Sequence, residues 1–256
     1  METGGVAVIT GAGRPWSLGR ACAVRLASRG VSIAIVDLRD DWGKDAVAAV
    51  EHAGARGFFA MTDVSRRDDV ADMVTAVLDE FGRVDTLINC AAVVENRPLD
   101  LITDDHLDRV IGINLGGTIL TCQAVAPIMR RGGGGRIINL ASGAAVRPLR
   151  TTGVYSASKA AVIGFSRVLA LELAGDGIVV SVVAPGTMGN AMGSETGPQA
   201  QGDIGSETLA AALPAQPFGA LPTTSQVAEL VTYLGTSSSP ILAGQTLHAN
   251  AGAWMV

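Results

Sequence analysis

A tyrosine and a lysine stand four residues apart in a chain that contains very few of either. Tyr155 is one of two tyrosines, and Lys159 is one of two lysines among 19 basic residues. On a helix this spacing places both side chains on one face. An ammonium group beside a phenol favours the phenolate and lowers the phenol pKa from its usual value of about 10 towards the range of a general acid or base. The pair therefore predicts proton transfer at a substrate oxygen; the structural alternative is a solvated surface pair.

A glycine-containing segment, residues 10–19, follows the first apolar run and opens the first amphipathic segment. Glycines at this place let backbone N–H groups approach a pyrophosphate, and the helix N-terminus adds partial positive charge. Asp37 ends the second apolar run, where a carboxylate accepts ribose hydroxyls and repels a 2′-phosphate. We therefore expect a dinucleotide cofactor, with NAD favoured over NADP. Arg14 and Arg39 are the counter-evidence, since either could hold a phosphate, and Asp37 could instead cap the next segment.

The elements that must position these residues alternate regularly along the chain. Short apolar, β-branched runs separated by longer amphipathic segments predict an α/β fold, a doubly wound parallel sheet of about seven strands with helices on both faces. Ser65 and Thr103 are candidate helix caps. No linker or repeat divides the chain, so residues 1–256 form one domain. The expected strands are 6–10, 32–36, 57–61, 86–89, 136–140, 178–184 and 246–249, and the expected helices are 18–29, 42–53, 66–81, 104–130, 154–173 and 225–234.

One segment, residues 187–218, breaks this alternation. It is small, polar and rich in Gly, Pro and Ser, and it contains no Lys or Arg. Ligands of open α/β sheets bind beside the carboxyl ends of strands, and this segment leaves such an end. We expect a substrate lid here, with a mobile surface loop as the alternative.

Charge and composition exclude several function classes. The net charge is −5 and no run of Lys or Arg occurs, so nucleic acid is not an expected partner. The uncharged stretches 110–129 and 230–256 are interrupted by polar, Gly or Pro residues, so no membrane association is expected. Three cysteines without CxxC spacing, and no leader segment at the N-terminus, suit a protein of the reduced cytoplasm.

The chain resembles the short-chain dehydrogenase/reductase family over essentially its whole length. The motifs that carry this resemblance are the loop 10–19, Asp63-Val64, Asn89-Cys90-Ala91-Ala92, Asn114, Ser142, Tyr155-x-x-x-Lys159, Pro185-Gly186 and Gly244-Gln245-Thr246. Ser142 stands 13 residues before Tyr155, the spacing found in the family. The resemblance implies a Rossmann-type sheet and NAD(P)-dependent hydride transfer between a nicotinamide and a secondary alcohol or ketone.

The resemblance also implies roles for individual residues. Tyr155 would donate or accept the proton at the substrate oxygen, and Ser142 would hydrogen-bond that oxygen. Lys159 would lower the Tyr155 pKa and bind the nicotinamide ribose, while Asn114 would hold a water that links Lys159 to solvent. The expected cofactor contacts are Gly11, Arg14, Ser17, Leu18, Gly19, Asp37, Leu38, Asp63, Val64, Asn89, Cys90, Ala91, Tyr155, Lys159, Pro185, Gly186 and Met188.

The substrate would be a small alcohol or ketone bound beside Ser142 and Tyr155, with Val94, Val146, Arg150 and Met192 as further contacts. No metal site is expected. The family also implies a homodimer or homotetramer, built through the long helices around residues 104–130 and 154–173.

Departures from the family pattern leave alternatives open. The loop has two extra residues, and Ser17 replaces its middle glycine, which is similar to the loop of enoyl carrier-protein reductases. Those enzymes place their tyrosine seven residues before the lysine, where this chain has Thr152, so carbonyl and alcohol chemistry is favoured. A 3-oxoacyl carrier-protein reductase is the first alternative, with an acidic carrier on Arg130, Arg131 and Arg167. A non-catalytic NAD-binding regulator is the second.

Overall fold

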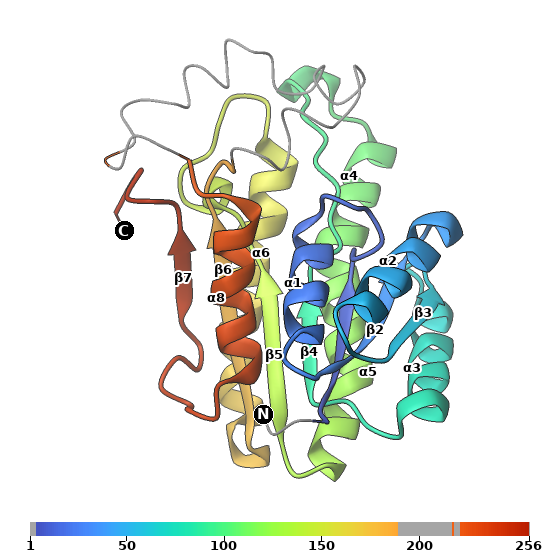
Figure 1. Cartoon of the computed structure of the whole chain (residues 1–256). Coiled ribbons are helices and arrows are strands. Elements are labelled where there is room, and N and C mark those ends of the chain that lie inside the picture. The colour runs from blue at the N-terminus through green and yellow to red at the C-terminus, as the bar shows by residue number, and fades with distance from the viewer. Residues whose placement is uncertain (1–3, 189–216, 218–220, 256) are drawn as a thin grey trace.

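Seven parallel strands form one sheet in the order β3-β2-β1-β4-β5-β6-β7, which confirms the expected α/β architecture. The computed structural model describes residues 4–188, 217 and 221–255 (Figure 1). Every strand lies where the apolar runs predict it, to within one residue at each end. The strands are β1 (Val6–Thr10), β2 (Ser32–Asp37), β3 (Gly57–Met61), β4 (Thr86–Asn89), β5 (Gly135–Leu140), β6 (Ile178–Pro185) and β7 (Thr246–Ala249).

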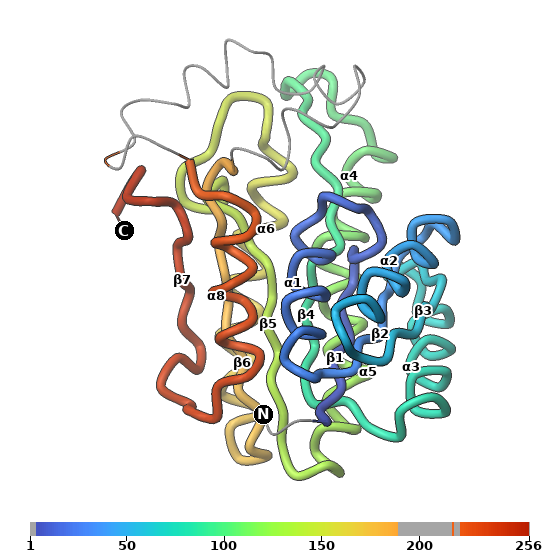
Figure 2. Tube along the Cα trace, viewed as in Figure 1, coloured from blue at the N-terminus to red at the C-terminus, as the bar shows by residue number. Residues whose placement is uncertain are grey.

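Helices cover both faces of this sheet, as the Cα trace in Figure 2 shows. Apolar side chains of α1, α2 and α8 pack on one face, and those of α3, α5 and α6 pack on the other. The helices are α1 (Leu18–Ala27), α2 (Asp40–His52), α3 (Arg67–Phe81), α4 (Asp104–Ile111), α5 (Gly117–Arg131), α6 (Gly153–Leu173) and α8 (Thr224–Thr236). Short helical turns lie at η1 (Leu99–Leu101), η2 (Gly112–Gly116), η3 (Gly143–Ala145) and η4 (Ala174–Asp176).

The central strands explain why the apolar runs in the sequence are nearly continuous. All residues of β1 and β4 are buried, and Val8, Ile9, Leu87 and Ile88 are fully excluded from solvent. A strand covered by helices on both faces has no polar side, so the alternation seen in half-exposed strands is absent.

Two local expectations are corrected by the structure. The expected helix 104–130 is divided, because a π-helical segment, η2, separates α4 from α5. Ser65 does not cap α3: this helix begins at Arg67, and the Ser65 hydroxyl donates to Asp63 instead. Thr103 does cap α4, since its hydroxyl accepts the His106 N–H at 3.2 Å. Hydrophobic periodicity locates helices but carries no signal for one extra residue in a turn.

The strand order reverses between β1 and β4: β2 and β3 are added on one side of β1, and β4 to β7 are added on the other. Carboxyl ends of all seven parallel strands face one edge, the upper edge in Figure 1. A crevice at such a switch point is the usual ligand site of an open α/β sheet. Of the expected lid 187–218, only Thr187, Met188 and Pro217 belong to the described residues. At the carboxyl edge of the sheet lie the loop 10–19, Asp37 and Ser142.

By length and composition alone, two helical stretches of the described chain could cross a membrane, Asp104–Arg131 and Gly153–Asp176. Both belong to the layer that packs on the sheet through α5 and α6. Core helices of such proteins commonly pass the same test, and these stretches are therefore assigned to the fold.

Candidate active site

The glycine-containing loop joins β1 to α1 by a capped helix start. Ser17 is the N-cap of α1, and its hydroxyl accepts the Arg20 N–H at 3.0 Å. Gly19 has no room for a side chain, because a Cβ there would lie 2.6 Å from the carbonyl oxygen of Gly11. Gly11 has φ +65° and touches the backbone of Ala91, so it needs glycine for both reasons. The loop backbone is therefore closely apposed to the first turn of the helix, as pyrophosphate binding requires.

Asp37, at the end of β2, is held by backbone donors. One carboxylate oxygen accepts the Gly13 N–H at 2.8 Å, and the other accepts the Leu38 N–H at 2.8 Å. A Cβ at Gly13 would lie 2.8 Å from the Asp37 carboxyl carbon, so the loop and the carboxylate touch. The half-buried carboxylate is thus fixed beside the loop, at the end of the site where an adenosine ribose would bind.

The two arginines that could hold a 2′-phosphate both lie against Trp42. The guanidinium carbon of Arg14 is 5.0 Å from the centre of the indole ring, and that of Arg39 is 4.2 Å from it. Arg39 also donates to both carboxylate oxygens of Asp41, at 3.0 and 2.6 Å. This pairing raises the pKa of Arg39 and lowers the pKa of Asp41. Both arginines thus have partners within the protein.

The end of β4 supplies the floor of the site. The Thr10 hydroxyl accepts the N–H groups of Cys90 and Ala91, each at 3.1 Å, and so ties this segment to β1. The Asn89 side chain turns into the core, where it donates to Asn139 at 2.9 Å and accepts from Thr121 at 2.8 Å. Only the backbone of Asn89 is therefore left for the predicted cofactor contact.

Tyr155 and Ser142 meet where α6 begins beside the end of β5. Ser142 caps the turn η3, with its hydroxyl accepting the Ala144 N–H at 3.2 Å. A hydrogen bond with Ser142 lowers the pKa of Tyr155, but burial of the phenol is the larger effect and raises it. Lys159, whose ammonium donates to Leu140, is not among the groups that shift the pKa of Tyr155, and its expected effect on the phenol stays a prediction for the enzyme with cofactor bound.

Lys159 is buried, and its Nζ donates to the carbonyl oxygen of Leu140 at 2.8 Å. Burial lowers the pKa of Lys159 from 10.5 to about 8. This ammonium, one helical turn from Tyr155, is the one cationic group of the predicted catalytic set. Its hydrogen bond to the end of β5 ties α6 to the strand that precedes Ser142.

Asn114 lies in the π-helical segment and is fully buried. Its side-chain oxygen Oδ1 accepts the Val93 N–H at 2.8 Å, and its side-chain amide nitrogen donates to the Val93 carbonyl at 3.0 Å and to the Ser158 hydroxyl at 3.1 Å. Both amide hydrogens are thereby used. Asn114 connects the loop after β4 to the residue next to Lys159, and the water it is expected to hold remains a prediction.

The other expected cofactor residues lie around the same edge. Asp63 accepts two hydrogen bonds from Ser65, and Val64 is buried against Gly117. Gly186 follows Pro185 at the end of β6 and donates its N–H to Ala249 at 2.9 Å. Leu18 and Met188 pack partly buried against one hydrophobic cluster, whereas Leu38 is exposed.

The expected substrate contacts come from two loops that touch each other. The Arg97 N–H donates to the carbonyl oxygen of Thr151 at 2.8 Å, which joins the segment after β4 to the segment before α6. On these loops Val94 is half-buried, and Val146 and Arg150 are exposed. Met192 lies outside the described residues.

Sequence reasoning missed Trp254, which the C-terminal segment brings to the catalytic edge. A Cβ on Gly143, the residue after Ser142, would overlap the indole, and one on Gly186 would lie 3.1 Å from it. Arg147 holds this segment by donating to the Ala253 carbonyl at 3.0 Å, and its guanidinium carbon is 5.9 Å from the ring centre. No motif near Trp254 marks this position, since the contact joins residues more than 60 positions apart.

The residue set fits a dinucleotide, because glycines line the loop and the Arg14 N–H has no acceptor among the described residues. The family model of the short chain dehydrogenases matches residues 5–201. The chain belongs to this family. It is 37% identical over 247 residues to the short-chain reductase protein NovJ of Streptomyces niveus, covering 96% of this chain and 93% of that protein.

Two further relatives bear on the chemistry. A 3-oxoacyl-acyl-carrier-protein reductase, FabG of Staphylococcus epidermidis, is 33% identical over 252 residues, with 97% of this chain and 98% of that protein covered. The crystal structure of an NAD⁺-bound xylitol dehydrogenase superposes with a TM-score of 0.86 at 27% identity and covers 98% of this chain and all of that one. This short-chain dehydrogenase is accordingly an NAD(P)-dependent oxidoreductase that transfers hydride between a nicotinamide and a secondary alcohol or ketone.

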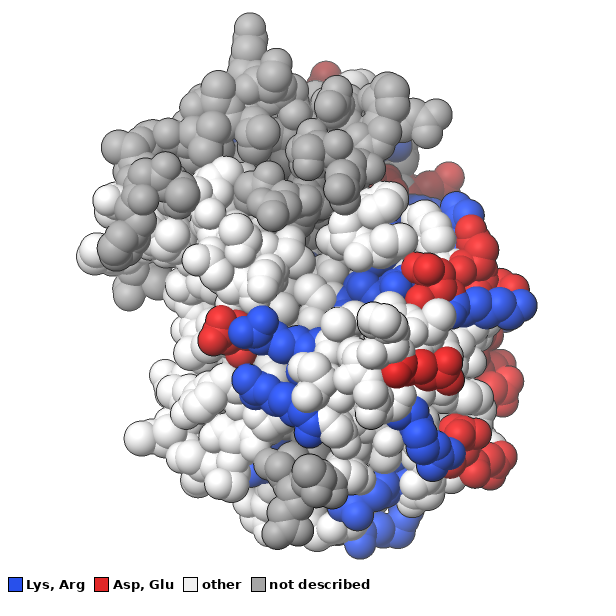
Figure 3. Space-filling view, in the orientation of Figure 1, with Lys and Arg blue, Asp and Glu red and all other residues white. Residues whose placement is uncertain are grey.

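The surface of this dehydrogenase carries mixed charge. On the face shown in Figure 3, acidic and basic side chains adjoin one another around α2 and α3. Ion pairs such as Lys44–Asp40 and Arg56–Glu80 account for this mixture. Among the described residues, no group of three or more His, Cys, Asp or Glu could hold a metal ion.

Proposed function

We propose that this protein oxidises a small secondary alcohol with NAD⁺, with Tyr155 as the general base. The observation that carries the proposal is the meeting of Tyr155 and Ser142 at the carboxyl edge of the sheet, one turn from the buried Lys159. The nicotinamide, when bound, supplies the hydride acceptor. Tyr155 takes the hydroxyl proton, and Ser142 hydrogen-bonds the same oxygen. Before this transfer Lys159 would stabilise the phenolate form of Tyr155, which becomes the phenol as it takes the proton, and Lys159 would also bind the nicotinamide ribose.

The preference for NAD rests on Asp37. Its carboxylate faces the ribose end of the site and would repel a 2′-phosphate. The arginines that could offset this repulsion are stacked on Trp42, and Arg39 is also paired with Asp41. The NAD⁺-bound xylitol dehydrogenase, a structural neighbour, supports the same cofactor and a hydroxylated substrate.

Initial rates with NAD⁺ and NADP⁺ on a panel of secondary alcohols test the proposal. Turnover with NAD⁺ that Tyr155→Phe removes is the expected result. A strong NADP⁺ preference, or an unchanged rate in Tyr155→Phe, would refute the cofactor or the mechanism respectively.

A 3-oxoacyl carrier-protein reductase remains the second candidate, because FabG of Staphylococcus epidermidis is among the relatives. Its expected carrier site is less well supported. Arg130 and Arg131 end α5 and precede β5, so they lie at the edge of the sheet opposite to Tyr155. Arg130 is also paired with Asp176 at 2.7 Å. A carrier-linked 3-oxoacyl substrate separates the two candidates. Only a carrier-protein reductase should reduce this substrate faster on the carrier than as a free thioester.

We also infer a homodimer or homotetramer in the cytoplasm. In each of the long apolar stretches Asp104–Arg131 and Gly153–Asp176, only 44% of an apolar 18-residue segment is buried. Val168 and Leu171 are exposed on α6, and Leu107 is exposed on α4, which packs against α6. A second copy would cover these side chains. Light scattering of the wild type and of Leu171→Glu tests this; an unchanged monomeric mass in both would refute it. All three cysteines are free, which is compatible with a reducing compartment.

A further inference from the structure

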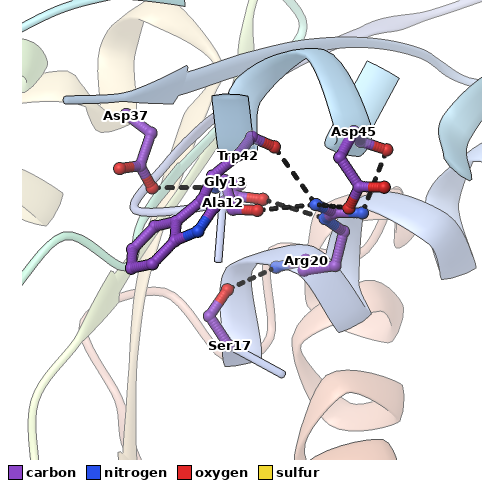
Figure 4. A network of polar contacts seen from close by, with 7 residues as sticks. All are labelled: Ala12, Gly13, Ser17, Arg20, Asp37, Trp42 and Asp45. Atoms are coloured by element: carbon purple, nitrogen blue, oxygen red, sulfur yellow. Dashed lines mark hydrogen bonds and ion pairs between the residues drawn. The ribbon is translucent and has the colours of Figure 1, made fainter. Parts of the chain in front are cut away.

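The Arg20 side chain joins the phosphate loop to the start of α2. It is only 6% exposed, and its guanidinium donates to five oxygen atoms (Figure 4). Two are loop carbonyls, of Ala12 at 3.3 Å and Gly13 at 2.6 Å. The other three belong to α2: the carbonyls of Trp42 and Asp45, each at 3.2 Å, and the Asp45 carboxylate at 2.8 Å. Only the planar fork of a guanidinium can serve acceptors on two elements in this way.

These bonds set the direction of two consecutive peptide groups in the loop. In a planar trans peptide the C=O and the next N–H point in opposite directions. Because Arg20 holds the Ala12 carbonyl, the Gly13 N–H points away from it, towards the Asp37 carboxylate at 2.8 Å. Because Arg20 also holds the Gly13 carbonyl, the Arg14 N–H points away in the same manner. Among the described residues the Arg14 N–H has no acceptor, so it is free for an anionic ligand.

The α2 end of the same network bears on the arginines of the adenosine site. Arg20 fixes the Trp42 carbonyl, and the Trp42 indole is the surface on which Arg14 and Arg39 lie. The position of the loop and the position of this stack are therefore set by one side chain. Burial of a guanidinium is expensive unless all its donors are satisfied, and here the acceptors are supplied by the cofactor loop and by α2.

We propose that Arg20, oriented by Asp45, is a positioning residue for the dinucleotide. It turns the Arg14 N–H towards the pyrophosphate and holds the Gly13 N–H on Asp37, the group that recognises the adenosine ribose. This inference rests on the proposed NAD-dependent function. Arg20 contributes to cofactor affinity and to the choice between NAD and NADP, and it leaves the hydride-transfer step unaffected.

The test compares Arg20→Lys and Asp45→Asn with the control Arg25→Met. Arg25 lies on the same helix and is also ion-paired, with Glu229 at 3.0 Å, but it does not contact the loop. Calorimetric titration with NAD⁺ gives the dissociation constant, and steady-state rates give KM for NAD⁺ and kcat separately. Thermal unfolding by circular dichroism shows that each variant is folded at the assay temperature.

Arg20→Lys is expected to raise the Kd and KM for NAD⁺ about tenfold or more, as the loss of charge-assisted hydrogen bonds implies, with kcat at saturating NAD⁺ within about twofold. Asp45→Asn should raise the Kd and KM for NAD⁺ by a smaller factor. Both Arg20→Lys and Asp45→Asn should lower the ratio of NAD⁺ to NADP⁺ affinity. Arg25→Met should change neither the NAD⁺ affinity nor this ratio. An unchanged NAD⁺ Kd in folded Arg20→Lys would overturn the proposal. A fall in kcat of this variant as large as the rise in its KM for NAD⁺ would overturn it as well. If Arg20→Lys does not fold, Asp45→Asn decides, because Asp45 is exposed. A wild type that binds no NAD⁺ would instead refute the proposed function.

Discussion

The buried Lys159 makes a prediction about stability that is separate from its role in catalysis. Its ammonium is buried and donates to a carbonyl oxygen, that of Leu140, at 2.8 Å. Burial lowers its pKa from 10.5 to about 8. At neutral pH the folded protein therefore carries a charge that the interior disfavours. Replacement by the apolar side chain of similar length, Lys159→Met, removes that charge.

The magnitude follows from the two pKa values. Each tenfold change in proton affinity corresponds to about 1.4 kcal/mol, so the buried charge destabilises the fold by about 3 kcal/mol at pH 7. The folded-state pKa is the lower one, so between pH 8 and 10.5 the unfolded chain binds more protons than the native chain. This contribution to stability accordingly rises with pH, and at pH 10 the destabilisation has fallen to about 1 kcal/mol.

Urea unfolding of the wild type and Lys159→Met at pH 7 and pH 10 measures this difference. The advantage of Lys159→Met over the wild type should shrink by about 2 kcal/mol between the two pH values. Loss of the donor to Leu140 subtracts a nearly constant amount, about 1 to 3 kcal/mol, which cancels in the comparison. Lys44→Met is the matched control, since Lys44 is exposed and pairs with Asp40 at 2.7 Å. Equal pH dependence in both variants would show that burial of Lys159 is not the cause.

Three further substitutions test the loop and the C-terminal segment. Ser17→Ala removes the α1 cap and should lower the free energy of unfolding by about 1 kcal/mol; an unchanged urea midpoint would contradict the cap. Gly19→Ala places a Cβ 2.6 Å from the Gly11 carbonyl, so NAD⁺ affinity measured by titration should fall, whereas retained affinity would mean that the loop can move apart. Trp254→Ala opens space beside Gly143 and should change the ratio of kcat/KM between bulky and small secondary alcohols by about 10-fold, with KM for NAD⁺ unchanged; an unaltered ratio would place the indole outside the substrate site.

Local sequence patterns predicted the parts of this site that depend on local spacing. Tyr155 and Lys159 share a helix, and Ser17 and Gly19 stand at the start of another, so their relative placement follows from backbone geometry. The apolar runs predicted all seven strands, because the central strands are covered by helices on both faces and are nearly continuously apolar, while the edge strands β3 and β7 are partly buried.

The remaining features depend on contacts between distant segments or on one side chain's choice of partner. Arg20 looks like any arginine on an amphipathic helix, and only the approach of α2 shows that it is buried. Trp254 reaches Gly143 across more than 100 residues of sequence. The Lys159 ammonium donates to Leu140, and no spacing rule states which acceptor a buried lysine will choose.

The number of residues in the π-helical segment Gly112–Gly116 affects how Asn114 is placed in the site. A π turn contains one residue more than an α turn, so deletion of a single residue here would restore a regular helix. An α turn and a π turn each complete about one revolution, so the deletion would leave α4 and α5 in nearly the same relative orientation and would remove the local bulge. The packing of α5 on α3 and of α4 on α6 would then be retained. The deletion should therefore disturb mainly the hydrogen bonds by which Asn114 joins Val93 to Ser158.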